Sequence, residues 1–411
     1  MCYSFTWNTP PNARRTAVLY PDGCYHGPVK IPRALAVAPL LLILALLAAA
    51  CVSTENPSGW AAPVFGTQNV YFLEAHDHLG AAAIPGTAPQ TQLTWVFPNA
   101  NDAAQKNIKL QAVYGDPVLD EPHIYFSSFS GGVFALNAKD GSIVWQMKSE
   151  ISGNVAGGVA VSSTLLAFGT TDGHLYVVNK SDHTTASGWP TAGLSLGTGI
   201  WTAPIFSPDG NTLYVATMGG LVHAFNVKDH AEAWGQPFRA DGAIADMALL
   251  DATHLFVPTL SGHVYSLDPT QGGKVTAHFV AKDWVWTRAA FKAGIAYFGD
   301  FSGNLYALDL NSGQLKWEKQ VSSNGSQIKA APAISGGLLV VADRSPAVHF
   351  IDPTDGSVKN TVPLLNVGTV RSALEVRPND SYVYLVTTNG HFFRADPAHL
   401  KVEEITVGGR P

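Results

Sequence analysis

Residue types that commonly carry chemistry are few and unevenly placed in this chain of 411 residues. All three cysteines lie in the first 51 residues, the last being Cys51, so the rest of the chain can form no disulfide. His76 and His78 flank Asp77 as two metal ligands would, but their spacing places no third ligand nearby, and we interpret the segment as a solvated loop. Neither HExxH, CxxC nor a P-loop follows Cys51. The sequence therefore predicts no metal site and no catalytic residue.

Composition limits both the fold and the partners. Hydrophobic residues make up 46% of the chain and charged residues 14%, with 39 Gly and 26 Pro. This is too apolar for a disordered chain and too rich in turn residues for a helical bundle, so we expect an all-β protein. The formal net charge of −6 offers no basic surface for a polyanion, and nucleic acid is not expected as a partner.

Residues 1–50 are interpreted as a leader. Residues 40–50 form an apolar run behind Lys30 and Arg33, and the run is too short to cross a bilayer as a permanent helix. Residues 47–51 resemble a bacterial lipobox, with Ala48 where Leu is usual. We therefore expect an exported protein that is lipidated at Cys51 and held on a membrane by its acyl chains. The alternative is a plain signal peptide that ends near a cysteine.

The first 28 residues do not fit a signal peptide, since they separate Met1 from the apolar run and contain Pro10, Pro11 and Pro21. We interpret the true start of translation as lying near residue 29. Residues 51–59 then form a lipidated cysteine and a short tether, and residues 60–411 form the globular part.

From Trp60 onward one phrase recurs: an apolar strand, a Gly-containing turn, a strand ending in Asp or Asn, another turn, and a strand that often carries Trp. Its clearest copy, residues 296–317, reads AYFGDFSGNLYALDLNSGQLKW. Seven copies are plain, and an eighth, degraded copy is expected within residues 70–96. The copies begin about 40 to 50 residues apart, which is the length of one β-propeller blade. We expect eight blades of four antiparallel strands, with seven blades or a mixed closing blade as alternatives.

A further, innermost strand is expected before each phrase, where small residues suit the crowded axis of a ring. The eight segments are residues 61–65, 113–118, 156–161, 201–206, 245–250, 286–291, 329–334 and 371–376. When their starts are aligned, five large or charged side chains fall on one rim of the central funnel, and Ala156 and Ala245 complete the ring. The five are Tyr114, Trp201, Trp286, Lys329 and Arg371. They form a candidate binding patch for a peptide or an anionic ligand; the alternative is that the tryptophans plug the channel and the cations cap it.

The repeated pattern G-x-(L/V)-(Y/F)-A-L-(D/N)-x-x-(S/D)-G-x-x-x-W resembles the repeat of PQQ-type (quinoprotein-like) propellers. With the lipobox-like leader, the chain is most similar to BamB-type lipoproteins. The resemblance implies a non-enzymatic scaffold that acts as a monomer within a larger complex and binds envelope proteins of outer-membrane protein assembly.

A PQQ-dependent quinoprotein oxidoreductase or a small-molecule sensor is the alternative function. Quinoprotein enzymes hold PQQ beside calcium and carry a pair of adjacent cysteines, which this chain lacks after Cys51. We therefore expect neither PQQ nor calcium as a cofactor.

Overall fold

The computed structural model describes residues 59–74, 78–130, 132–322, 325–377 and 380–409. The leader, the expected lipidation site at Cys51, almost all of the tether and the pair His76 and Asp77 lie outside the described residues. None of the helices in the described ranges is long and apolar enough to cross a membrane.

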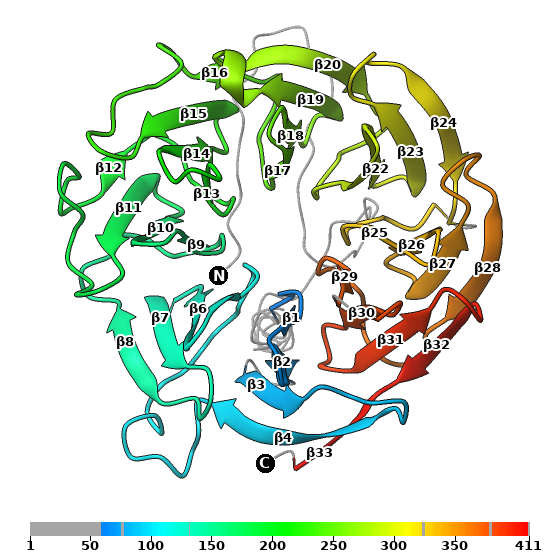
Figure 1. Ribbon diagram of the computed structural model, residues 1–411, viewed down its shortest axis with the longest axis horizontal. Helices are drawn as coiled ribbons and strands as arrows, with labels where there is room; N and C mark the ends of the chain where they lie inside the picture. The colour runs from blue at the N-terminus through cyan, green and yellow to red at the C-terminus, as the bar shows by residue number, and fades with distance from the viewer. Residues whose placement is uncertain (1–58, 75–77, 131, 323–324, 378–379, 410–411) are drawn as a thin grey trace, which may run out of the picture. The chain divides into compact units, whose positions relative to one another are not determined.

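Eight antiparallel sheets of the described residues are arranged as blades of a ring (Figure 1), which confirms the eight-bladed propeller and excludes seven blades. Blade 1 contains β1 (Val64–Phe65), β2 (Asn69–Glu74), β3 (His78–Ala83) and β4 (Gln90–Phe97). Blade 2 contains β5 (Val118–Asp120), β6 (His123–Ser128), β7 (Gly132–Asn137) and β8 (Ile143–Met147). Blade 3 contains β9 (Ala160–Val161), β10 (Leu165–Gly169), β11 (His174–Asn179) and β12 (Leu194–Ser195). Blade 4 contains β13 (Ile205–Phe206), β14 (Thr212–Ala216), β15 (Leu221–Asn226) and β16 (Phe238–Arg239).

The second half of the ring repeats this order. Blade 5 contains β17 (Ala248–Asp251), β18 (His254–Pro258), β19 (His263–Asp268) and β20 (Lys274–Val280), with the 3-10 helix η1 (Pro269–Gln271) before β20. Blade 6 contains β21 (Ala290–Lys292), β22 (Ile295–Gly299), β23 (Asn304–Asp309) and β24 (Leu315–Gln320). Blade 7 contains β25 (Ala333–Ser335), β26 (Leu338–Ala342), β27 (Ala347–Ile351) and β28 (Val358–Pro363). Blade 8 contains β29 (Glu375–Val376), β30 (Val383–Val386), β31 (Phe392–Asp396) and β32 (Lys401–Glu404).

The innermost strands are much shorter than predicted. Pairing in blade 4 is confined to Ile205 and Phe206, although residues 201–206 were expected to form the strand. The preceding residues lie next to the axis, where adjacent segments approach too closely for a side chain at some positions. A Cβ on Gly157 would lie 2.4 Å from the carbonyl oxygen of Thr202 in the next blade. Crowding at the axis therefore explains the small residues, as expected. Most of each predicted segment, however, is loop and not strand.

Apolar clusters fill the interfaces between blades. Within the described residues, eight such clusters each combine side chains of two neighbouring blades. The cluster between blades 8 and 1 includes Phe72 and Phe392, whose stacked rings have centroids 4.8 Å apart. Burying an aromatic side chain of this size contributes about 1.5–3 kcal/mol, so the last interface closes the ring as the others do.

Tryptophans of three outermost strands, Trp95, Trp145 and Trp317, link their blades to the next blade. Nε1 of Trp95 donates to the carbonyl oxygen of Ala138 at 3.1 Å, and a Cβ added at Gly141 would lie 2.7 Å from the same indole ring. Gly141 has a φ of +71°, which glycine adopts without strain. In blade 3 the equivalent residue is His183, with a φ of 60° and a ring stacked 4.7 Å from that of Trp145.

The C-terminal segment also closes the ring. Strand β33 (Thr406–Gly408) pairs in parallel with β4 and makes blade 1 a five-stranded sheet (Figure 1). Arg394 of blade 8 is 2% exposed and donates to the carbonyl oxygens of Gly86 and Thr87 in blade 1, at 2.7 and 2.5 Å. The ring is therefore closed by an added strand at the perimeter. The sequence alone did not decide how the ring closes.

Candidate functional site

One backbone hydrogen bond recurs at the axis and fixes the rim of the funnel. In seven blades, the turn between the second and third strands donates an N–H to the carbonyl two residues before the rim position, as Phe301 does to Trp284 at 3.0 Å. The residue directly before each rim position is a buried Val or Ile; these are Val113, Val155, Ile200, Ile244, Val285, Ile328 and Val370. The five residues predicted from the sequence, Tyr114, Trp201, Trp286, Lys329 and Arg371, thus lie at equivalent positions and are all half-buried.

The first rim group, which we call the Trp60 cluster, joins blades 8, 1 and 2. The rings of Trp60 and Tyr114 have centroids 4.2 Å apart, and that of Phe129 lies 5.6 Å from Tyr114. The guanidinium carbon of Arg371 lies 5.6 Å from the Trp60 ring centroid, within cation–π distance. Trp60 was not predicted as a rim residue, because the front copy of the repeat is degraded.

The second group, the Trp286 cluster, joins blades 6 and 7. Phe301 lies 5.7 Å from Trp284 and 5.9 Å from Trp286 between ring centroids. Nζ of Lys329 lies 4.8 Å from the Phe301 centroid and 5.4 Å from the Trp286 centroid. The cation and the rings therefore hold one another in place, and their half-buried faces remain at the rim.

Trp201 stands apart from both clusters. None of the ring contacts found among the described residues involves it. Its neighbours in the ring, Ala156 and Ala245, are small, so Trp201 is the single large side chain at the rim positions of blades 3 to 5. A role in binding stays a prediction for all five residues.

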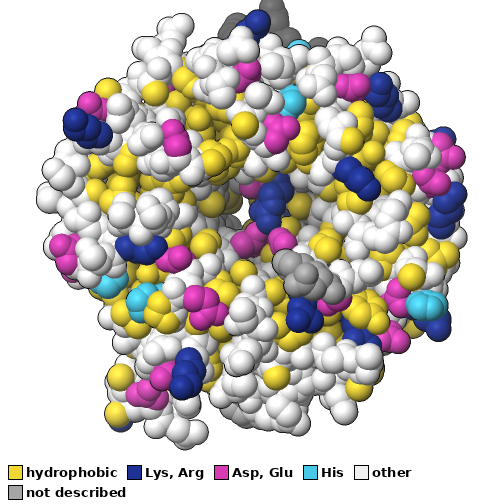
Figure 2. Space-filling model, in the orientation of Figure 1, with side chains coloured by type: hydrophobic (Ala, Val, Ile, Leu, Met, Phe, Trp, Pro, Cys, Tyr) yellow, Lys and Arg dark blue, Asp and Glu magenta, His cyan; other side chains and the backbone are white. Residues whose placement is uncertain are grey.

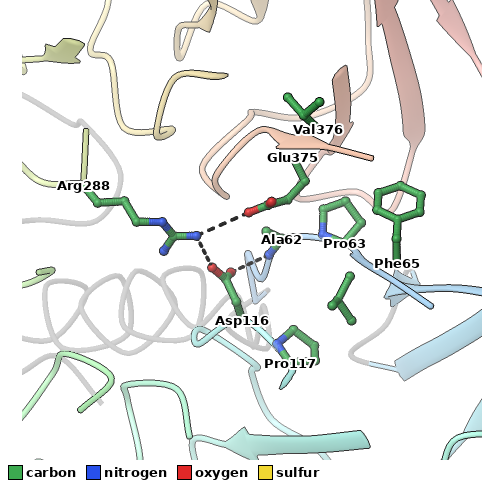
Figure 3. A pocket seen from close by; sticks show the side chains of 9 residues that line it. Ala62, Pro63, Phe65, Asp116, Pro117, Arg288, Glu375 and Val376 are labelled. Carbon is green, nitrogen blue, oxygen red and sulfur yellow. Dashed lines mark hydrogen bonds and ion pairs between the residues drawn. The ribbon is translucent and has the colours of Figure 1, made fainter. Parts of the chain in front are cut away.

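A group of four charged side chains lies deeper in the funnel and was not predicted. Arg288 comes from the segment before β21, and its Nη2 lies 2.6 Å from Oδ2 of Asp116 and 3.4 Å from Oε1 of Glu375 (Figure 3). Its Nη1 lies 3.9 Å from Oδ2 of Asp246. These side chains, which we call the axial charge group, are 24–37% exposed. Figure 2 shows cationic and acidic side chains gathered in the hollow centre of the ring.

Backbone donors orient two of the carboxylates. Oδ1 of Asp116 accepts the N–H of Ala62 at 2.7 Å. The carboxylate of Asp246 accepts the N–H of Arg288 at 2.9 Å and that of Met247 at 2.8 Å. Among the described residues, Glu375 accepts a hydrogen bond only at Oε1. The axial charge group therefore has three carboxylates for one guanidinium, a formal excess of two negative charges.

Burial and this charge excess shift the pKa values. Burial raises the pKa of Glu375 to about 7; Arg288 lowers it in part, and Asp116 raises it further. Burial also raises the pKa of Asp246, against the opposing effect of Arg288. Burial acts to lower the pKa of Arg288, but the three carboxylates outweigh it, so that this pKa is raised and the guanidinium stays charged.

Two small cavities flank Glu375. The first has a volume of about 260 Å³ and is lined by Ala62, Pro63, Val64, Phe65, Asp116, Pro117, Arg288, Glu375 and Val376 (Figure 3). The second has a volume of about 270 Å³, shares Glu375 and Val376, and is otherwise apolar. The apolar walls explain why burial is the main cause of the raised Glu375 pKa.

A signal for the axial charge group was present in the sequence. The predicted innermost segments are short, apolar and rich in small residues, and a charge inside such a segment stands out. Asp116, Asp246, Arg288 and Glu375 each lie within one of these segments. Aligning only the starts of the segments selected the rim and passed over the layer below it.

The axial residues do not fit PQQ. Cavities of this size are smaller than the roughly 300–1,000 Å³ of sites for drug-sized ligands. The three carboxylates would also repel PQQ, which is itself a tricarboxylate. In the part of the chain that the structure describes, no three His, Cys, Asp or Glu side chains are arranged to hold a metal ion.

One catalytic pattern contradicts the expectation that the sequence holds none, but it lacks its usual structure. Residues 193–197 read GLSLG and match the GxSxG pattern of serine hydrolases. In that pattern the serine lies on a sharp turn between a strand and a helix. Here Leu194 and Ser195 form the outer strand β12, so the match carries no catalytic argument.

The family model and the similar proteins found by comparison carry the same description. The family model described as outer membrane protein assembly factor BamB matches residues 58–190 and 183–398. Proteins of that name are 22% identical over 276 residues in Moranella endobia, covering 65% of this chain and 68% of the relative, and 26% identical over 250 residues in Yersinia pestis, covering 57% and 60%. The Salmonella typhimurium protein is 28% identical over 272 residues, covering 59% and 64%. The matches thus span about two thirds of these relatives.

Solved structures show the same fold. The crystal structure of BamB from Moraxella catarrhalis aligns with a TM-score of 0.62 at 17% identity, covering 81% of this chain and 93% of that one. The computationally designed protein Ika8 aligns with a TM-score of 0.61 at 16% identity, covering 82% and 96%. Because a designed protein matches as well as a natural one, this likeness concerns the fold alone.

Proposed function

Because this chain belongs to the family of the outer membrane protein assembly factor BamB, we propose that it is a non-enzymatic scaffold that binds other envelope proteins through the rim of its propeller. The partners are proteins or peptides of outer-membrane protein assembly, and the chain acts as a monomer within their complex. It needs no cofactor for this role.

The chemistry of the rim supports this proposal. The Trp60 and Trp286 clusters place half-buried tryptophan, tyrosine and phenylalanine rings beside Arg371 and Lys329. Trp, Tyr and Arg are the residue types that most often dominate protein interfaces, because their rigid apolar area and directed polar groups lose little entropy on binding. The ring and cation contacts within each cluster restrict these side chains before a partner arrives, which lowers the entropic cost of association.

Membrane attachment is part of the same proposal. The leader and lipobox-like residues 47–51 support export, lipidation of Cys51 and attachment on the periplasmic side of the envelope. Each buried CH₂ group of an acyl chain contributes about 0.8 kcal/mol, so several chains anchor the protein without a spanning helix. Intact mass of the protein purified from its own bacterium tests this, since a chain that retains residues before Cys51 or lacks the lipid mass contradicts the anchor.

Site-specific photocrosslinking in the native bacterium tests the binding face. A photoreactive phenylalanine analogue at Trp284 is expected to capture proteins of outer-membrane protein assembly. The same analogue at Val275, a 41% exposed residue on the perimeter strand β20, is the control. Equal capture of the same proteins from both positions, or none from Trp284, would overturn the proposal that the rim is the binding face.

A further inference from the structure

The cavity beside the axial charge group has features that select a cationic ligand. Its polar lining consists of Asp116, Glu375 and Arg288, and its apolar lining includes Pro63 and Phe65. With Asp246, the four charged groups carry a formal excess of two negative charges. An anion in the cavity would lie against these carboxylates, whereas a cation would offset charge that Arg288 leaves uncompensated.

Glu375 supplies a place for the ligand to bind. Its Oε1 accepts from Arg288 at 3.4 Å, and no residue in the described part of the chain donates to its Oε2. Oδ2 of Asp116 is held by Arg288 at 2.6 Å, and Oδ1 by the backbone N–H of Ala62. A donor that enters the cavity therefore finds Glu375 as its acceptor, and the aromatic ring of Phe65 is part of the same lining (Figure 3).

The size of the cavity limits the ligand. A volume of about 260 Å³ is below the range of about 300–1,000 Å³ for drug-sized molecules. It is sufficient for a charged group on a short aliphatic arm, such as a lysine or arginine side chain. We propose that the axial cavity is a binding site for an alkylguanidinium or alkylammonium group, which bonds Glu375 and Asp116 and packs its arm against Pro63, Phe65 and Val376.

Proton linkage makes ligand binding at this site depend on pH. Asp116, Arg288 and Glu375 are the charged groups that line the cavity, and Asp246 contacts Arg288 outside this lining. Burial raises the pKa of Glu375 to about 7. A bound cation favours the ionised carboxylate, so binding releases a proton near neutral pH. Because only the ionised form binds well, the apparent affinity should rise roughly tenfold between pH 6 and pH 8.

The site can be tested with n-butylguanidinium as the probe in calorimetric titrations of the full chain. We expect millimolar binding at pH 8, weaker binding at pH 6, and release of protons that shows as a dependence of the heat on the buffer. Glu375→Gln should weaken binding about tenfold and abolish the pH dependence. Asp116→Asn should weaken binding, and Glu150→Gln, which changes an exposed carboxylate, should leave it unaltered.

Two further titrations identify the source of the cation. The results that would refute the proposed site are also defined. Binding of acetyl-Gly-Arg-Gly-amide, but not of its Gln counterpart, assigns the cavity to a basic side chain of a protein; binding of the free guanidinium alone assigns it to a small amine. The site is refuted by an absence of saturable heat at pH 8, by equal binding of n-butyrate, or by affinities that neither Glu375→Gln nor Asp116→Asn alters. None of these results depends on the assembly role.

Discussion

Arg288 and Asp116 are separated by 172 residues in the sequence, yet Nη2 of one lies 2.6 Å from Oδ2 of the other. They belong to blades 6 and 2, which are four positions apart in a ring of eight. The bond therefore crosses the axis and ties opposite sides of the ring together, in addition to the apolar interfaces between neighbours.

Replacing Arg288 should loosen this connection. Arg288→Gln removes the one cation from three carboxylates, and the repulsion that remains should lower the free energy of unfolding by about 1–2 kcal/mol, between the values of exposed and fully buried ion pairs. Urea denaturation at pH 7 measures the change.

Lys316→Gln is the matched control, since Lys316 pairs with Asp309 on the exposed surface and its loss should cost less than about 0.5 kcal/mol. Equal stability of the Arg288 variant and the wild type would contradict the cross-axis role.

Glu375 should make stability depend on pH. Its folded pKa of about 7 is above the ordinary value, so between about pH 4.5 and pH 7 the folded state binds more protons than the unfolded state, and stability falls as pH rises. Glu375→Gln should therefore match the wild type at pH 5 and be more stable at pH 8.

The size of this difference follows from the shift. A full shift of this size corresponds to about 3 kcal/mol, and solvent screening of a side chain that is more than one third exposed reduces it to about 1 kcal/mol. Denaturation of both proteins at pH 5 and pH 8 measures it, and a variant less stable than the wild type at pH 8 would show that Arg288 dominates the energy of Glu375.

Arg394 should be essential for ring closure. It is 2% exposed, and Arg394→Met leaves the carbonyls of Gly86 and Thr87 and the carboxylate of Glu403 without their donor. Gly86 and Thr87 are exposed residues and the Glu403 side chain is 45% exposed, so water replaces part of the lost contacts and the expected loss is about 1–3 kcal/mol.

Chemical denaturation compares this variant with Arg377→Met, which removes a partly exposed arginine paired with Asp380. Similar losses of stability from the two substitutions would mean that the pairing of β33 with β4 is sufficient for closure without Arg394.

His183 tests the contact between blades 2 and 3. His183→Ala keeps a positive φ and loses the stacking on Trp145, whereas His183→Gly loses the stacking but removes the backbone strain. The alanine variant should be less stable than the glycine variant by about 1 kcal/mol in thermal unfolding.

Gly141→Ala provides the reciprocal change in the neighbouring blade. An added Cβ meets the Trp95 ring at 2.7 Å and a positive φ, so this substitution should cost more than His183→Gly. The opposite order would mean that strain at this turn is not what selects glycine.

The sequence predicted the parts of the fold that depend on local patterns. The phrase at residues 296–317 contains the strand pair, its turn at Gly303 and the cap at Asp309, all of which occur within one blade. The rim positions were also predictable, because an innermost segment precedes every copy of the repeat at a similar distance. The number of blades was predictable for the same reason.

The remainder depends on contacts between distant copies. Closure through Arg394 and β33 joins residues about 300 positions apart, and no local pattern encodes that pairing. Arg288 and Asp116 likewise meet only because blades 2 and 6 face each other across a ring of eight. The innermost strands were predicted too long because strand propensity does not register the crowding at Gly157.

The central claim is that the rim clusters bind the partner proteins. The decisive measurement is the amount of outer-membrane assembly proteins that co-purify with the full chain from its own bacterium, for the wild type and for Trp286→Ala combined with Lys329→Ala. Each of these residues should contribute about 1–2 kcal/mol as an interface hot spot, so the double variant should retain less than about one tenth of the partners. Val275→Ala, an exposed substitution on the perimeter strand β20, is the control and should retain most of them. A folded double variant that retains its partners as the wild type does would contradict the account.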